Sequence, residues 1–181
     1  GTADIAGMST LQLATLSTGA ISGLDSGDIA ALSSSQLAAL STAQLRAIST
    51  AALAGLDSTD LQALGTGRLQ AISSAQLGAF GSDQLNALTT AQIRSLNAGQ
   101  LDGLDAADLD ALSTTNLAAL TTTQLASLST AQMAGLTADL GVLSSTQINA
   151  IAPPSLAALG TALTSDDILT LMPTGIAALT T

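Results

Sequence analysis

The sequence predicts an all-α fold, a solenoid or superhelix of very short helices with one helix in each eight-residue repeat. Three observations predict it. The chain repeats every eight residues from Gly1 to Leu136, two positions of each octad are almost always aliphatic, and the first position carries a residue that caps helices. The consensus octad is S-T-A-Q-L-x-A-L, and its positions are numbered one to eight.

Positions five and eight carry the predicted core. Position five is aliphatic in every octad, from Ile5 to Met133, and position eight is aliphatic in all but one, where Phe80 stands. Residues three apart lie on the same face of a helix, so the pair forms one apolar edge. Position six varies freely, so we expect it to face water. Position seven is always small, which indicates a close approach of two backbones.

Position one predicts where each helix begins. It is Ser, Thr, Asp, Asn or Gly in all 17 octads, and these are the preferred N-cap residues. Position four is Gln or Asp in most octads, as in Gln12, Asp28 and Gln76. Ser/Thr-x-x-Gln is a capping box, in which each side chain satisfies a backbone N–H of the other residue. Its recurrence at a fixed spacing predicts a helix start in every octad.

One continuous helix and a β-solenoid are the alternatives to this fold. In a continuous helix, eight residues overshoot two turns by about 80°, so the apolar pair would spiral around the axis. Strands favour alternating apolar residues and β-branched interiors, whereas Ala, Gln and Leu dominate here. We therefore expect helices of about six residues, too short to be stable without a shared core. The number of octads per superhelical turn and its hand are left open.

The register changes after Leu136. Residues 137–143 form a seven-residue unit, 144–151 and 152–159 restore the octad, and four extra residues precede two more octads at 164–171 and 172–179. Solenoids need atypical terminal units to cover the last core face. We expect a single continuous solenoid, with seventeen regular octads at 1–136 and degenerate repeats with a candidate C-terminal cap at 137–181.

Composition and charge exclude several partners. The 181 residues carry 13 acidic and 3 basic side chains, a net charge of −10, and no His or Cys. Arg46, Arg68 and Arg94 are isolated, whereas phosphate binding needs clustered positive charge, so we expect no nucleic-acid partner. No run approaches the roughly 18 apolar residues of a transmembrane helix, so we expect no membrane insertion.

We assign no catalytic, cofactor-binding or metal-binding residue from the sequence, and we expect no enzyme. Acid–base and nucleophilic chemistry usually call for His, Cys, Lys or a perturbed carboxylate pair, and the abundant Ser and Thr have no evident base. Paired aspartates do recur: Asp25/Asp28, Asp57/Asp60, Asp105/Asp108 and the adjacent Asp166/Asp167. Calcium needs about six to eight oxygen ligands. Asp at positions one and four suits a helix N-terminus, so capping is the preferred interpretation and a weak calcium site the alternative.

Position two is Ser or Thr in 15 of 17 octads, with Ala98 and Ala106 as the exceptions. A regular array of hydroxyl and methyl groups could match a crystalline lattice such as ice. The simpler interpretation is an exposed first helical turn that needs a small residue. Ice binding is therefore a remote alternative.

The segments STAQLRAISTAALAGL (41–56) and TTAQIRSL (89–96) resemble octapeptide-repeat stretches in very large secreted bacterial surface proteins of the adhesin and exoprotein type. The resemblance covers residues 1–159. It implies an extracellular or cell-surface location and an acidic, cysteine-poor stalk between the flanking domains of a larger chain. The glycine- and aspartate-rich calcium nonapeptides often found in such proteins are absent, and no binding residues carry over.

The function that we expect is a structural spacer or stalk within a larger secreted or cell-surface protein. The chain starts at Gly1 rather than Met, which indicates a fragment of something longer. The alternative is a protein–protein interaction scaffold, because solenoids often bind along an extended face, here formed by positions three and six. Those positions offer no Trp, Tyr or clustered Arg as an anchor, so a protein partner stays unidentified.

Overall fold

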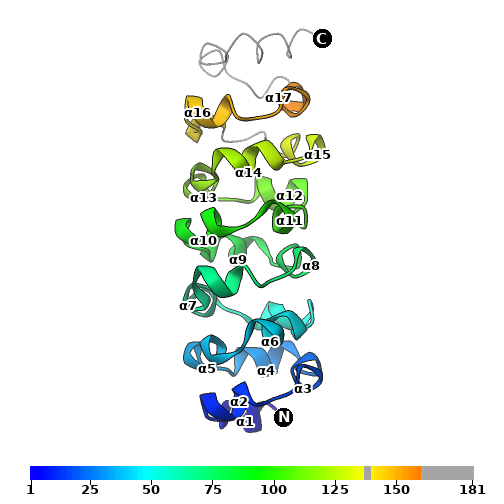
Figure 1. Ribbon diagram of the computed structural model, residues 1–181, viewed down its shortest axis with the longest axis vertical. Helices are drawn as coiled ribbons and strands as arrows, with labels where there is room; N and C mark the ends of the chain where they lie inside the picture. The colour runs from blue at the N-terminus through cyan, green and yellow to red at the C-terminus, as the bar shows by residue number, and fades with distance from the viewer. Residues whose placement is uncertain (137–139, 160–181) are drawn as a thin grey trace.

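The computed structural model describes residues 1–136 and 140–159 and shows a rod of short helices stacked in successive turns (Figure 1). The chain enters at the end formed by α1 and climbs turn by turn to α17. The described part of the chain contains helices and turns but no strand. The predicted all-α solenoid of very short helices is confirmed.

Nearly every octad forms one helix. In chain order the helices are α1 (Thr2–Ala6), α2 (Thr10–Ala14), α3 (Thr18–Ser22), α4 (Ser26–Ala30), α5 (Ser34–Ala39), α6 (Thr42–Ala47), the 3₁₀ helix η1 (Ala52–Gly55), α7 (Ser58–Leu69), α8 (Ser74–Leu77), α9 (Ser82–Ala87), α10 (Thr90–Ser95), α11 (Ala98–Leu101), α12 (Ala106–Asp110), α13 (Thr114–Ala119), α14 (Thr122–Ser127), α15 (Thr130–Met133), the 3₁₀ helix η2 (Leu140–Val142), α16 (Ser145–Ile148) and α17 (Pro153–Leu159).

A capping box marks the start of most helices. At α6, the Gln44 backbone N–H donates to the Ser41 hydroxyl over 3.2 Å, and the Ser41 N–H donates to the Gln44 side-chain oxygen over 2.9 Å. The helix ends four residues later, where Ile48 donates its N–H to the Leu45 carbonyl oxygen and turns to an extended conformation. That extended residue leads directly into the next cap. The predicted start of a helix at position one is confirmed.

Helix α7 departs from the rule of one helix per octad. It covers parts of two octads, and Gly65 inside it has φ 66° and ψ 171°, which breaks the helix at the octad boundary. Gly65 is the only residue with a positive φ in the described ranges. A side chain disfavours that conformation, so glycine replaces the usual Ser or Thr at this position one.

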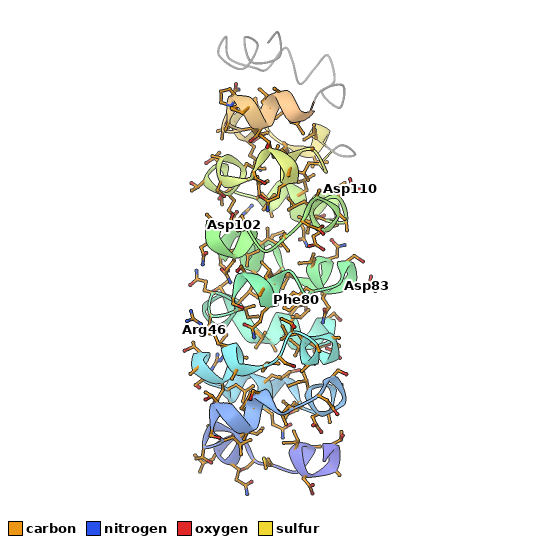
Figure 2. All side chains as sticks on the ribbon, turned by 90° about the vertical axis from the view of Figure 1, so that its right-hand side faces the viewer. Arg46, Phe80, Asp83, Asp102 and Asp110 are labelled. Carbon is orange, nitrogen blue, oxygen red and sulfur yellow. The ribbon has the colours of Figure 1, made fainter. Side chains whose placement is uncertain are left out.

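The core is a continuous strip inside the rod. Position five is buried in all seventeen regular octads, and position eight is buried from Leu32 onward. Phe80 takes a leucine position and is 2% exposed (Figure 2). The position-eight residues of the first three octads, Met8, Leu16 and Leu24, are half-buried against the same core. The predicted core positions are confirmed.

Each turn of the superhelix stacks on its neighbour. Helices in substantial contact are typically three octads apart, as in α2 with α5, α3 with α6 and α10 with α13. Side-chain hydrogen bonds between turns join residues separated by 25 to 31 positions. One superhelical turn therefore takes between three and four octads, which is the quantity that the sequence left open.

Two turns approach closely at the position-seven glycines Gly55 and Gly103. A Cβ added to Gly55 would collide with the carbonyl oxygen of Ser26, and a Cβ added to Gly103 would collide with that of Ser74. In both cases position seven meets position two of the octad three before it. The predicted close approach of backbones at position seven is confirmed, because only a glycine fits at these two contacts.

The change of register after Leu136 does not interrupt the stacking. The Gln147 side chain donates to the Leu120 carbonyl oxygen, 27 residues earlier, over 2.7 Å. The equivalent separation in the regular octads is 28 residues, so the seven-residue unit shortens it by one. The Ser155 hydroxyl donates to the carbonyl oxygen of Leu128, which is likewise 27 residues earlier in the chain. The candidate cap and the octads at 164–171 and 172–179 lie outside the described residues.

Candidate functional site

The most regular polar feature of the rod is a row of buried amides at position four. Their side chains are at most 7% exposed, in a protein whose other polar groups lie mostly at the surface. We call this row the amide ladder, and its members are Gln36, Gln44, Gln76, Gln92, Gln100, Asn116, Gln124 and Gln132.

A ladder glutamine caps two helices at once. The Gln44 side-chain oxygen accepts the Ser41 N–H and so caps the start of α6. The Gln44 Nε2 donates to the carbonyl oxygens of Leu13 and Leu16, over 2.8 and 2.9 Å. Those carbonyls belong to positions five and eight of the octad four before, at the end of α2. The Leu13 oxygen also accepts the Leu16 N–H, whereas a carbonyl beyond the helix end, as at Leu16, has no partner within its own helix. One side chain therefore joins the start of one helix to the end of another, one turn below.

The same geometry recurs along the rod. Gln100 donates to the carbonyl oxygens of Leu69 and Ile72, both over 2.8 Å. Gln132 donates to those of Leu101 and Leu104, over 2.7 and 2.8 Å. The ladder thus links turn to turn by direct hydrogen bonds that the Leu and Ile side chains shield from water.

This geometry shows what Gln at position four provides that a carboxylate would not. Glutamate completes a capping box equally well, but it has no N–H to donate when ionised. The amide accepts through its oxygen and donates through its nitrogen, so both ends are satisfied in a buried place. Within residues 1–136 and 140–159, no buried side-chain nitrogen or oxygen lacks a hydrogen-bond partner.

Three successive octads form the longest interruption of the ladder, and Asp108 makes another. Position four is Ala52, Asp60 and Arg68 in these octads. Arg68 donates through Nε to the Leu40 carbonyl oxygen over 3.4 Å, which is one of the two bonds that a glutamine would make there. Asp60 cannot donate, and instead accepts a hydrogen bond from the Ser34 hydroxyl over 3.0 Å. The turns are still linked here, but by fewer amide bonds.

A second set of bonds between turns comes from position six. Arg46 Nε donates to the Ala71 carbonyl oxygen over 2.8 Å, and Gln70 Nε2 donates to that of Ser95 over 3.1 Å. The same bond, from position six to position seven three octads later, is made by three further donors: Gln62 to Ala87, Asn86 to Ala111 and Arg94 to Ala119.

The expectation that position six only faces water is therefore incomplete. Arg46, Gln70 and Arg94 are exposed, as expected, yet each also bridges two turns. One signal of this was present in the sequence. Long hydrogen-bond donors recur at residues 46, 70 and 94, which are 24 residues, or three octads, apart.

Comparison with known families places these features in a recurrent motif. A family model described as the ALTTAQ repeat matches the chain at residues 1–34, 21–58, 29–66, 53–90 and 103–138, together more than half of its length. The chain belongs to the ALTTAQ repeat family. The letters ALTTAQ occur unchanged at residues 87–92. Comparison with curated proteins and with solved structures gave no match.

The ALTTAQ motif runs from position seven of one octad to position four of the next. It therefore contains the small residue of the close approach, the core leucine, the N-cap and the ladder amide in one stretch. In residues 87–92, Thr89 donates its N–H to the Gln92 side-chain oxygen over 2.9 Å, and Gln92 donates to the Leu61 carbonyl oxygen over 2.6 Å. The motif is thus the unit that carries both the local cap and the bond to the preceding turn.

The paired aspartates of the ALTTAQ array act as helix caps. The Asp28 N–H donates to the Asp25 carboxylate over 2.9 Å, and the two other described pairs have the same geometry. The capping interpretation is confirmed for these three pairs, while Asp166 and Asp167 lie outside the described residues. In residues 1–136 and 140–159, no three acidic side chains gather so as to hold a metal ion.

The outer surface of the ALTTAQ array carries single charges and shallow hollows. Asp83, Asp102 and Asp110 lie on the outside of the rod (Figure 2). Position-two residues are exposed or half-buried at the first turn of each helix. A hollow of about 420 Å³ is lined by Thr42, Ala43, Arg46, Gly67, Gln70 and Ala71. A second, of about 510 Å³, is lined by Thr122, Ser145, Thr146, Asn149 and Ala150.

These hollows offer hydroxyl, amide and methyl groups. The one cation among their lining residues, Arg46, is already bonded through Nε to the backbone of the next turn. Across the described ranges, none of the helices has the length and the apolar run that crossing a bilayer would need.

Proposed function

We propose that this ALTTAQ repeat array is a structural spacer or stalk segment of a larger secreted or cell-surface bacterial protein, with no catalytic role. The amide ladder is the observation that carries the proposal. Its buried glutamines, and the donors at position six, form hydrogen bonds that join one turn to the next. The most regular polar chemistry of the chain thus serves its own continuity as a rod.

The dimensions of the rod also support a spacer. Packed helices lie about 8–10 Å apart, so each superhelical turn adds roughly 9 Å of length. One turn takes about 28 residues, because turn-to-turn bonds join residues 25 to 31 apart. Residues 1–159 therefore span roughly 50 Å, about a tenth of their fully extended length. The array is therefore a stiff, wide rod that is short for its number of residues.

The resemblance of residues 41–56 and 89–96 to repeats of secreted adhesin-type proteins supports an extracellular location. The acidic surface, with a net charge of −10, supports solubility of a chain that is 47% hydrophobic. Fractionation of cells that express the parent protein tests this location. Recovery of the parent protein only in the cytoplasm would contradict it.

Replacement in the parent protein tests the spacer role itself. One variant lacks the array, a second carries an unrelated rigid helical segment of the same length, and a third carries a flexible Gly/Ser linker. We expect antibody access to the domain beyond the array to fall in the first variant and to return in the second. Failure of the unrelated rigid segment to restore function, with antibody access intact, would reject the spacer and favour an interaction scaffold.

A further inference from the structure

We propose that the array is an extensible tether, which unwinds from an end under axial tension, one or a few octads at a time, and rewinds when the tension falls. The inference rests on the proposed function, since a segment that connects an anchored part of a protein to a distant one bears tension along its axis. Three features of the rod carry it.

The first feature is that contacts reach only the adjacent turn. Helices in substantial contact are typically three octads apart, and side-chain bonds between turns join residues 25 to 31 apart. No sheet or long-range pairing ties distant turns to one another in the described ranges. The stability of such an array is a sum of repeat terms and neighbour terms, so an end octad can open while the others stay folded.

The second feature is the direction of the bonds. The ladder bonds of Gln100 to Leu69 and Ile72, and the position-six bond of Arg46 to Ala71, run from one turn to the next. Tension along the rod therefore acts on the bonds of every interface between turns. A turn at either end has a neighbour on one side only, so its octads open before those of the interior turns.

The third feature is the absence of covalent or slow obstacles to rewinding. The chain has no Cys, so no disulfide limits its extension. Its three prolines are Pro153, Pro154 and Pro173, so residues 1–152 contain no X–Pro bond to isomerise slowly. Most octads also carry their own capping box, as in Ser129 with Gln132, so a released segment needs only local bonds and the turn below to reform.

Force spectroscopy on the full 181-residue chain, held at its two ends, tests the inference. We expect extension in small steps at nearly constant force, with about 27 Å released per octad, because a residue of extended chain spans about 3.3–3.6 Å. We also expect the relaxation trace to follow the extension trace closely. A single abrupt release of the whole array, followed by delayed refolding at much lower force, would overturn the proposal.

Two substitutions strengthen the experiment. Gln100→Glu removes the ladder donor from a central octad, so the steps that open this region should occur at lower force. Gln12→Glu is the matched control, because Gln12 is exposed, forms the capping box with Ser9 and bonds to no other turn in the described residues. An equal drop in force for both variants would contradict the role of the ladder.

Failure of this proposal and failure of the spacer role are distinguishable. An array that opens in one abrupt event remains a spacer, but a rigid one. Conversely, loss of function with an unrelated rigid segment concerns the parent protein and leaves the force trace of the isolated chain unchanged.

Discussion

A single change of chemical group tests the amide ladder at the centre of the rod. Gln76→Glu replaces the side-chain amide by a carboxylate of nearly the same shape. The carboxylate can still accept the Ser73 N–H, as the Gln76 oxygen does over 3.0 Å, so the capping box persists. It cannot donate to the carbonyl oxygens of Leu45 and Ile48, which the Gln76 Nε2 reaches over 2.9 and 2.8 Å.

The magnitude follows from the burial of this site. Gln76 is 3% exposed, so water cannot replace the lost donor. The Leu45 oxygen keeps the Ile48 N–H, so the Ile48 oxygen alone is left without a partner, which costs about 1–3 kcal/mol. A buried carboxylate beside two carbonyl oxygens adds to this cost. We therefore expect Gln76→Glu to lower the free energy of unfolding by about 3–5 kcal/mol at neutral pH.

The loss should also depend on pH. Burial and the neighbouring carbonyl oxygens disfavour the charged form, so they raise the pKa of the introduced carboxyl in the folded state above its unfolded value. The folded state then holds the proton more tightly than the unfolded chain does. The penalty of the substitution should therefore be largest above the folded pKa and decrease as the pH falls through it.

Thermal unfolding followed by circular dichroism measures both effects, with each variant compared with the unchanged chain at the same pH. The expected loss lowers the melting temperature by roughly 10 °C at neutral pH. Gln12→Glu is the control, since it keeps the box with Ser9 and lacks the bonds between turns, and we expect it to change stability by less than about 0.5 kcal/mol. Similar losses in the two variants would refute the reasoning.

Two pairs of glycines give the remaining predictions. Gly65 has φ 66° and ψ 171°, so Gly65→Ser should lower the free energy of unfolding by about 1–3 kcal/mol. Gly81 has φ −74°, which suits any residue, so Gly81→Ser should add a capping hydroxyl and raise that free energy by about a few tenths of a kcal/mol. Differential scanning calorimetry compares them, and a higher melting temperature for Gly65→Ser would disprove the strain argument. Gly103→Ala places a Cβ against the Ser74 carbonyl oxygen and should lower the free energy of unfolding by about 2 kcal/mol. Gly67 has nothing within 4 Å of an added Cβ, so Gly67→Ala should stabilise the helix by about 0.5–1 kcal/mol. Urea unfolding measures this second pair, and equal midpoints would show that no close approach exists at Gly103.

Features within one octad could be predicted because short-range interactions decide them. Ser41 and Gln44 are three residues apart, so the geometry of one helical turn is enough to form their capping box. Leu45 and Ile48 are also three apart and so share a helix face. Neither inference needs any knowledge of how successive turns stack, and both agree with the structure.

Features between turns could not be predicted in the same way. Gln44 bonds to Leu13, 31 residues away, and this separation depends on how many octads make a turn. That number depends on the angle between successive helices. This angle is set by the two extended residues that join them, such as Leu40 with φ −63° and ψ 137° and Ser41 with φ −69° and ψ 161°. Small differences in these angles accumulate along the chain, so residue types alone do not determine them. The 24-residue recurrence of donors at Arg46 and Gln70 is the one sequence signal that bears on it.

The number of octads in each turn is not a whole number, and this affects any domain joined to either end. One octad rotates the path by about 100° around the rod axis and advances it by only about 3 Å. Insertion or deletion of a single octad therefore changes the direction in which an attached domain points far more than it changes its distance. Seven octads complete about two full rotations and restore the original direction. A change in the number of octads would thus move an attached domain from one side of the rod to another.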